Sequence, residues 1–294
     1  MNNHYLKKVI RPFQSSFTEL ENKIADYLIQ TTRNLATCTL DDLANEIGVS
    51  NSSLYKFVRK IGYNGYQDFR VSIATNQNTS TNPYANFFPN FQTIEKEDSP
   101  HIIAQKVLNA NLYSLSNSLE YLDEEKLTHI LESISHSKAF HFFGVGGSSI
   151  TAYDSYHTFL RSKYWCNYIS DTHLQLSVAH KYTKDDCIFL FSHSGLSSEI
   201  LHVAKAIRET PAKIIVLTGN AASPLCKYAD EVILVVTEEA IFRTEAMMSR
   251  ISYITIMDIL YVNLMYLDYD NNYQSLKQLR KTLSSRKILQ TPKD

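Results

Sequence analysis

The segment Cys187–Glu199, CIFLFSHSGLSSE, decides the fold expected for the second half of the chain. It opens with the apolar run Cys187–Phe191, whose aromatic and branched side chains are typical of a strand buried on both faces. Serines and a glycine follow, and a helical pattern begins at Ser198. A strand, a short polar turn and a helix direct free backbone N–H groups at one point, where phosphate can bind. The alternative is an ordinary loop whose serines only cap the helix.

A second segment of the same kind lies upstream. The apolar run Ala139–Phe143 is followed by Gly144–Ser149, GVGGSS, and then by a helical stretch. Glycines let the backbone approach a ligand closely or turn tightly. A dinucleotide site is the competing interpretation, but Ser149 stands where the G-x-G-x-x-G pattern needs its last glycine. Two serine-lined turns in one sheet favour a small phosphorylated ligand.

These two motifs, each after a strand, resemble those of the sugar isomerase (SIS) domain family over roughly residues 105–270. In that family the second loop reads S-x-S-G-x-T/S and its hydroxyls hold the phosphate of a phosphosugar, while the first loop adds a serine. His193 is expected to contact the ligand rather than to move protons. The resemblance implies a phosphosugar site with these candidates: Gly146, Ser148, Ser149, Ser192, His193, Ser194, Ser197 and Glu245.

The remaining pattern predicts an α/β fold. Two helices are expected at 101–121 and 123–137, before the first strand. Further strands alternate with helical segments, which indicates a doubly wound parallel sheet. Ligands in such sheets bind at the carboxyl ends of the strands, where both serine loops lie. The strands after the first are expected at 165–169, 186–191, 213–218 and 231–236.

The composition excludes several classes of protein. The 294 residues are 44% hydrophobic and 20% charged, with a formal net charge of −1, so any attraction to nucleic acid or membrane must be local. No run approaches the ~18 apolar residues of a membrane span, and the N-terminus lacks the core of a signal peptide. The four cysteines are dispersed and form no C-x-x-C. We therefore expect no metal or other cofactor, and reduced thiols in the cytoplasm.

Residues 1–76 carry the pattern of a small all-α domain. A helix is expected from about Phe17, a second over 39–47 with Thr39 as its N-cap, and a third over 51–61. Gly48–Ser50 forms the tight turn between the last two, an arrangement that indicates a helix-turn-helix. Residues 77–100 hold three of the chain's seven prolines and are expected to be a linker, leaving 101–294 for the SIS domain.

The third helix has a polar, basic outer face suited to a DNA major groove. Residues 1–76 hold nine Lys and Arg against seven Asp and Glu, a bias of only 9 − 7 = +2. A three-helix bundle used for protein contacts, with this face simply solvated, is the alternative. The candidate DNA-binding residues are Ser50, Asn51, Ser52, Ser53, Tyr55, Lys56, Arg59 and Lys60.

The stretch Val49–Phe57, with the pairs Gly62-Tyr63 and Gly65-Tyr66 after it, resembles the helix-turn-helix domain of the RpiR family. Ser53 replaces the family's usual threonine and Lys56 its usual arginine, which keeps the charge but loses the bidentate fork. That family joins a helix-turn-helix to a SIS domain. The resemblance implies a cytoplasmic homodimeric transcriptional regulator of carbohydrate metabolism genes, which binds double-stranded DNA operators and is controlled by a phosphosugar.

Two other functions remain open at this point. An aldose–ketose isomerase needs a carboxylate base and usually a second acid or base. The helix expected over 241–267 has Glu245 and Asp258 within it and Glu239 just before it, but no lysine or histidine. This favours a non-enzymatic sensor over a phosphosugar isomerase with an added helical domain. The third candidate is a sugar-phosphate-sensing adaptor that never touches DNA.

Overall fold

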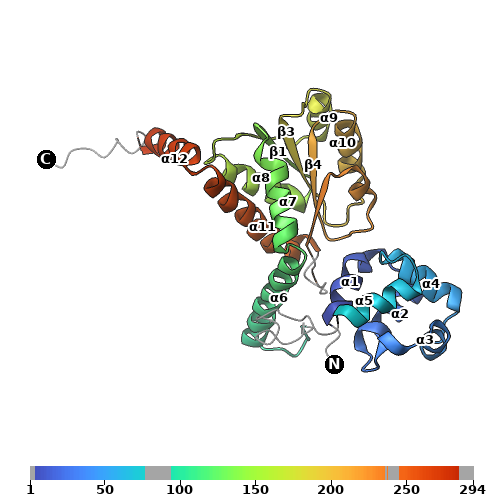
Figure 1. The fold of residues 1–294 in the computed structure, drawn as a ribbon. Helices are drawn as coiled ribbons and strands as arrows, with labels where there is room; N and C mark the ends of the chain where they lie inside the picture. The colour runs from blue at the N-terminus through green and yellow to red at the C-terminus, as the bar shows by residue number, and fades with distance from the viewer. Residues whose placement is uncertain (1–3, 77–93, 236, 238–244, 285–294) are drawn as a thin grey trace.

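The structure is a computed structural model that describes residues 4–76, 94–235, 237 and 245–284. It has a helical N-terminal domain, and an α/β domain from which the last helix projects as an arm (Figure 1). Within the described ranges, every helix falls short of the length and apolarity that crossing a membrane requires.

The N-terminal domain encloses one apolar core, to which Ile24, Leu43 and Phe57 each contribute a fully buried side chain. The predicted second and third helices are confirmed. The described elements are α1 (His4–Ile10), the 3-10 turn η1 (Arg11–Ser16), α2 (Glu19–Gln30), η2 (Leu35–Thr37), α3 (Leu40–Ile47), α4 (Asn51–Lys60) and α5 (Tyr66–Asn76).

Local chemistry fixes the helix-turn-helix. Thr39 and Asp42 form a reciprocal capping box at the start of α3. Gly48 ends that helix with φ 71°, a left-handed conformation that glycine adopts without strain. The Ser50 hydroxyl then accepts from the N–H of Ser53 and caps α4. The turn therefore holds α4 at a set angle to α3.

The second domain is built on a five-stranded sheet with the order β2-β1-β3-β4-β5, and every described strand pair is parallel. The α/β fold and the five strands are as predicted, with the last strand ending two residues early. The strands are β1 (Ala139–Gly144), β2 (Trp165–Tyr168), β3 (Asp186–Phe191), β4 (Lys213–Thr218) and β5 (Glu231–Leu234).

Helices cover both faces of this sheet, as a doubly wound fold requires. Alternate residues of β3 point to opposite faces: Phe189 and Phe191 enter one core, and Ile188 and Leu190 the other. The first core packs against α7 (Glu124–Ser135), α8 (Gly147–Phe159) and α11 (Glu245–Leu267), with α6 (Pro100–Glu120) beside α11. The second packs against α9 (Thr172–Ala179), α10 (Ser198–Arg208) and the turn η3 (Pro224–Tyr228).

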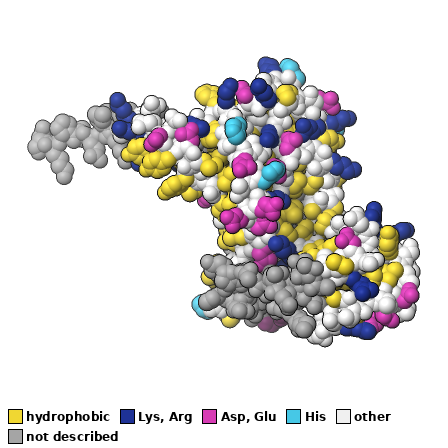
Figure 2. Space-filling model, in the orientation of Figure 1, with side chains coloured by type: hydrophobic (Ala, Val, Ile, Leu, Met, Phe, Trp, Pro, Cys, Tyr) yellow, Lys and Arg dark blue, Asp and Glu magenta, His cyan; other side chains and the backbone are white. Residues whose placement is uncertain are grey.

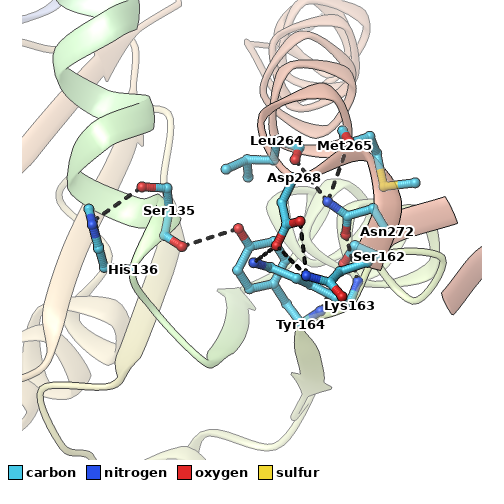
Figure 3. Close-up of polar contacts among 10 residues, drawn as sticks. Ser135, His136, Ser162, Lys163, Tyr164, Leu264, Met265, Asp268 and Asn272 are labelled. Carbon is cyan, nitrogen blue, oxygen red and sulfur yellow. Dashed lines mark hydrogen bonds and ion pairs between the residues drawn. The ribbon is translucent and has the colours of Figure 1, made fainter. Parts of the chain in front are cut away.

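The final helix, α12 (Tyr269–Ser284), is fixed to the body by a buried amide (Figure 3). Asn272 is fully buried, accepts from the N–H of Lys163 at 2.8 Å and donates to the carbonyl of Leu264 at 2.9 Å. Beside it, Lys163 forms an ion pair with Asp268 at 2.5 Å. These bonds join the start of α12 to the loop between α8 and β2.

Asn272→Ala should lower the free energy of unfolding by about 1–3 kcal/mol, because it leaves a buried N–H and a buried carbonyl without their partner. Urea unfolding measures the loss. The matched control is Asn271→Ala, an exposed neighbour that bonds only the side chain of Asp268, where a change within about 0.5 kcal/mol is expected. Equal losses in both variants would contradict the anchoring role of Asn272.

Candidate functional site

The carboxyl ends of β1 and β3 lie side by side. The two strands pair in parallel register, with Gly144 opposite Phe191, so the turns that follow them start level at the same edge. In the order β2-β1-β3-β4-β5 the direction of winding reverses between these two strands, where ligands of open α/β sheets bind. The structure therefore brings the two serine turns together, as the sequence predicted.

The first turn leads directly into α8. A side chain at Gly144 would overlap the carbonyl of Ser148, so the strand can pass beneath the helix only as glycine. Gly146, with φ 58°, precedes the helix without any side-chain cap, and the N–H groups of Ser148 and Ser149 donate to the carbonyls of Val145 and Gly146 at 3.2 and 3.1 Å. The Ser149 hydroxyl donates to the Gly146 carbonyl at 2.6 Å. Within the described chain the hydroxyl of Ser148 has no such bond.

The second turn is packed on the loop that follows β4. Ser192 is 4% exposed, and Gly195 adopts φ 64° against the side chain of Ser223. The Ser194 hydroxyl accepts from the N–H of Leu196 at 3.2 Å. Ser197 is the N-cap of α10, but its side chain makes no capping bond. The Ser197 hydroxyl therefore does not cap the helix, which was the alternative function considered for the serines of this loop.

The side chain of His193, within this turn, is held by contacts with α11, Thr237 and Gly219. Its Nδ1 lies 2.9 Å from the Tyr253 hydroxyl of α11 and its Nε2 lies 3.1 Å from Thr237 Oγ1. The ring packs directly on Gly219, where a side chain would collide with it. Burial lowers the pKa of His193 to about 4, so the imidazole is neutral. A ligand contact, the role expected from the sequence, would require the ring to give up one of these partners.

Glu245 is the first residue of α11, and its side chain lies outside the described residues. Its predicted ligand contact stays a prediction. No local pattern identifies Tyr253, Thr237 or Gly219 as supports of the site, since each is far from His193 along the chain.

The candidate DNA-binding residues, on α4 and its N-cap Ser50, fall into three groups. Five of these residues are exposed: Asn51, Ser52, Tyr55, which is 44% exposed, Lys56 and Arg59. One guanidinium nitrogen of Arg59 donates to the Asn64 carbonyl at 2.8 Å.

Ser50 and Ser53 form the second group. Their hydroxyls bond each other at 2.8 Å while Ser50 caps the helix. They position the helix start, which is the part of a recognition helix that meets base edges in other helix-turn-helix proteins.

Lys60 differs from the other basic residues. Its Nζ pairs with Glu21 of α2 at 2.8 Å and donates to the Ser16 carbonyl at 2.6 Å, and its side chain is only 29% exposed. Burial acts to raise the pKa of Glu21, but the bonds from Lys60 and Thr18 outweigh it and hold that pKa below its ordinary value. Lys60 thus braces the domain, and the DNA contact predicted for it would require it to leave these partners.

These features define the class: a helix-turn-helix protein with a SIS-type α/β domain. Residues 4–80 match the helix-turn-helix domain of the rpiR family, and residues 133–262 match the SIS domain. An uncharacterized HTH-type transcriptional regulator of Caldanaerobacter subterraneus subsp. tengcongensis is 34% identical over 280 residues, 95% of this chain and 97% of that protein. The chain belongs to the RpiR family, as its motifs predicted.

Solved structures show the same fold. Vibrio vulnificus NanR, determined in complex with ManNAc-6P, aligns with a TM-score of 0.58 at 22% identity over 95% of this chain and 98% of that chain. A putative sugar-phosphate isomerase from Listeria monocytogenes aligns with a TM-score of 0.52 at 22% identity, over 60% of this chain and 96% of that one. At these identities the likeness establishes the fold alone.

The buried neutral state of His193 should make stability depend on pH. The unfolded imidazole takes up a proton below about pH 6.5, whereas the folded one does so only near pH 4. The unfolded state therefore binds more protons between these values, and stability falls as pH is lowered through them, by up to about 1.4 kcal/mol per pH unit.

Urea unfolding at pH 7, 6, 5 and 4 tests this with His193→Gln, which keeps polar atoms but does not titrate. The variant should show a shallower fall than wild type across that range. His202→Gln, at an exposed histidine of α10, should leave the wild-type slope unchanged. Parallel curves for wild type and His193→Gln would mean that the ring titrates equally in both states.

Proposed function

We propose that the protein is a DNA-binding transcriptional regulator of carbohydrate metabolism genes, whose SIS domain binds a phosphosugar effector. The main observation behind this proposal is the pairing of Gly144 with Phe191, which sets two glycine–serine turns side by side. The same chain also contains a helix-turn-helix. Membership of the RpiR family supports the DNA-binding part. That NanR was solved with ManNAc-6P supports a phosphorylated sugar as the effector class.

In the proposed site the phosphate faces the uncapped start of α8 and the hydroxyls of both turns. The hydroxyl of Ser148 is a donor without an internal partner in the described chain, and the N–H groups of Ser148 and Ser149 would exchange their present carbonyl partners, Val145 and Gly146, for the phosphate. Ser149, Ser192, Ser194 and Ser197 complete the set of hydroxyls. Glu245, at the start of α11, is proposed to contact the sugar, and His193 holds the second turn in place.

Replacing the hydroxyls should remove phosphosugar binding while leaving DNA binding intact. Wild type should show a rise in Tm with at least one member of a panel of hexose, pentose and amino-sugar phosphates, since a ligand that binds only the folded state stabilises it. Ser192→Ala and Ser194→Ala should abolish that shift. Ser177→Ala, at an exposed serine of α9, is the control and should retain it. An unchanged shift in both site variants would place the pocket elsewhere.

In the proposed DNA complex α4 lies in the major groove. Its open face offers Asn51, Ser52 and Tyr55 to base edges, and Lys56 and Arg59 to phosphates. Ser50 and Ser53 set the start of the helix. Lys56 is a point charge without the guanidinium fork, which suits a phosphate better than a guanine.

Lys56→Met should weaken DNA binding about equally for specific and random duplexes, and should reduce the slope of log K against log salt by about 1, as one phosphate contact is lost. Lys60→Met is the matched comparison, since it removes a lysine that pairs with Glu21 inside the domain. It should leave the slope unchanged. Fluorescence anisotropy between 50 and 200 mM salt measures both. An equal loss of slope in Lys60→Met would show that its ion pair opens on DNA.

We propose that the protein is not an isomerase. Asp258 of α11 is exposed in mid-helix, and partial desolvation and the nearby Asp154 hold its pKa above the ordinary value. The helix Glu245–Leu267 contains no lysine or histidine that could act beside it as the second acid or base. Turnover of an aldose phosphate by the full chain would instead establish the isomerase alternative.

A homodimer is proposed as the form that reads a two-fold symmetric operator. Exposed apolar side chains gather on the lower edge of the arm made by α11 and α12 (Figure 2). Such a patch on a soluble domain marks a contact surface. Its described members are Val262, Tyr266, Leu267, Tyr269 and Tyr273.

A further inference from the structure

The two domains of one chain touch beside the candidate phosphosugar site. In Figure 1 the N-terminal domain lies below the sheet, with α1 next to the base of the α/β domain. The N–H of Ala221 donates to the carbonyl of Pro12 at 2.8 Å. The Arg11 guanidinium lies over the Tyr113 ring at 4.9 Å, and the Tyr121 hydroxyl donates to the Lys8 carbonyl. We call this set the interdomain contact.

On one side the interdomain contact rests on the second serine turn. Ala221 belongs to the loop Gly219–Ser223 after β4. Within that loop the N–H of Gly219 donates to the His193 carbonyl at 2.9 Å, and the Asn220 amide donates to the Ser194 carbonyl at 3.3 Å. Asn220 is buried and also accepts from the N–H of Ala222. The loop is therefore tied to the serine turn and cannot stay in place if that turn moves.

On the other side the contact rests on the recognition helix. Pro12 lies in η1, and the last carbonyl of this turn, that of Ser16, accepts from Lys60 of α4 at 2.6 Å. The next residue, Phe17, packs its ring 5.1 Å from that of Phe57 and beneath Lys60. A movement of η1 thus acts directly on α4.

We propose that the loop Gly219–Ser223 and the turn η1 couple phosphosugar binding to DNA binding within a single chain. The inference rests on the proposed function and adds the set of contacts through which ligand binding would act on α4. A ligand held by Ser194 favours one position of the turn, the loop carries that preference to Pro12, and η1 carries it to α4. Coupling of this kind needs only that the ligand bind two arrangements of the domains with unequal affinity.

The route predicts that breaking the interdomain contact uncouples the two sites without disabling either. The first variant combines Arg11→Gln with Tyr121→Phe, which removes two side-chain contacts that involve neither the serine turns nor the residues of α4. The second, Ala221→Pro, removes the N–H that bonds Pro12. The control combines Arg280→Gln with Ser284→Ala, which removes a guanidinium and a hydroxyl from the exposed surface of α12, outside the patch proposed for the dimer.

The measurement is the affinity of the full chain for a duplex selected from random DNA by the wild type. It is made by fluorescence anisotropy at fixed salt, with and without a sugar phosphate. The sugar phosphate used is the one that gives the largest Tm rise among glucose 6-phosphate, ribose 5-phosphate, glucosamine 6-phosphate and ManNAc-6P. Wild type and control should change affinity at least about fivefold on adding it, the lower end of typical allosteric coupling. Both contact variants should keep the Tm rise and bind DNA, with an affinity that changes less than about twofold.

Two results overturn the proposal and differ in meaning. A wild-type response retained in full by both variants would show that coupling does not pass through this contact, and would leave the effector function standing. No response in wild type, with the sugar phosphate bound, would overturn the effector function and this route together. If Ala221→Pro loses the Tm rise, it has disturbed the serine turn, and the double variant decides.

Discussion

The parallel pairing of β1 with β3 is the interaction on which the remainder of the molecule depends. The two strands are separated in sequence by α8, β2 and α9, yet they end level, with Gly144 opposite Phe191. A slip of two residues would move one turn about 6.6 Å along the other. Aromatic packing secures the register, with the rings of Phe142 and Phe189 stacked at 5.2 Å. The turns after β1 and β3 therefore lie at the same edge of the sheet because packing in the core fixes the register of the two strands.

Much of this arrangement could be predicted because its signals are local. An apolar run followed by glycines and serines identifies β1, β3 and the turns after them, and the parallel winding of the sheet brings those turns together. The helix-turn-helix could be predicted from the sequence in the same way. Thr39, Gly48 and Ser50 each act on backbone groups within a few residues, so their chemistry can be inferred from the sequence alone.

The contacts that could not be predicted join partners that are distant in sequence. Lys60 follows the buried Phe57 by three residues and so lies at the edge of the apolar face, but only the fold brings Glu21 to it, 39 positions away. The ring of His193 is oriented by Tyr253, 60 positions away. The elements α1 and η1 were not predicted either. Their contacts with Tyr113, Tyr121 and Ala221 arise only once both domains have formed.

The two helix starts at the candidate site are not equivalent, and the difference bears on how an anion is held. Neither Gly144–Ser149 nor Ser192–Glu199 contains a lysine or arginine, so the turns themselves offer N–H groups, hydroxyls and helix ends. The first turn of α8 has no acidic residue. That of α10 has Glu199, whose own backbone bond and the Ser198 hydroxyl hold its pKa below the ordinary value, so that it stays ionised beside that helix end. Because this carboxylate already lies in the positive field of α10, we infer that an anion bound at the proposed site would be compensated mainly by α8. The second turn then contributes hydroxyls and, through Asn220, the connection to the rest of the chain.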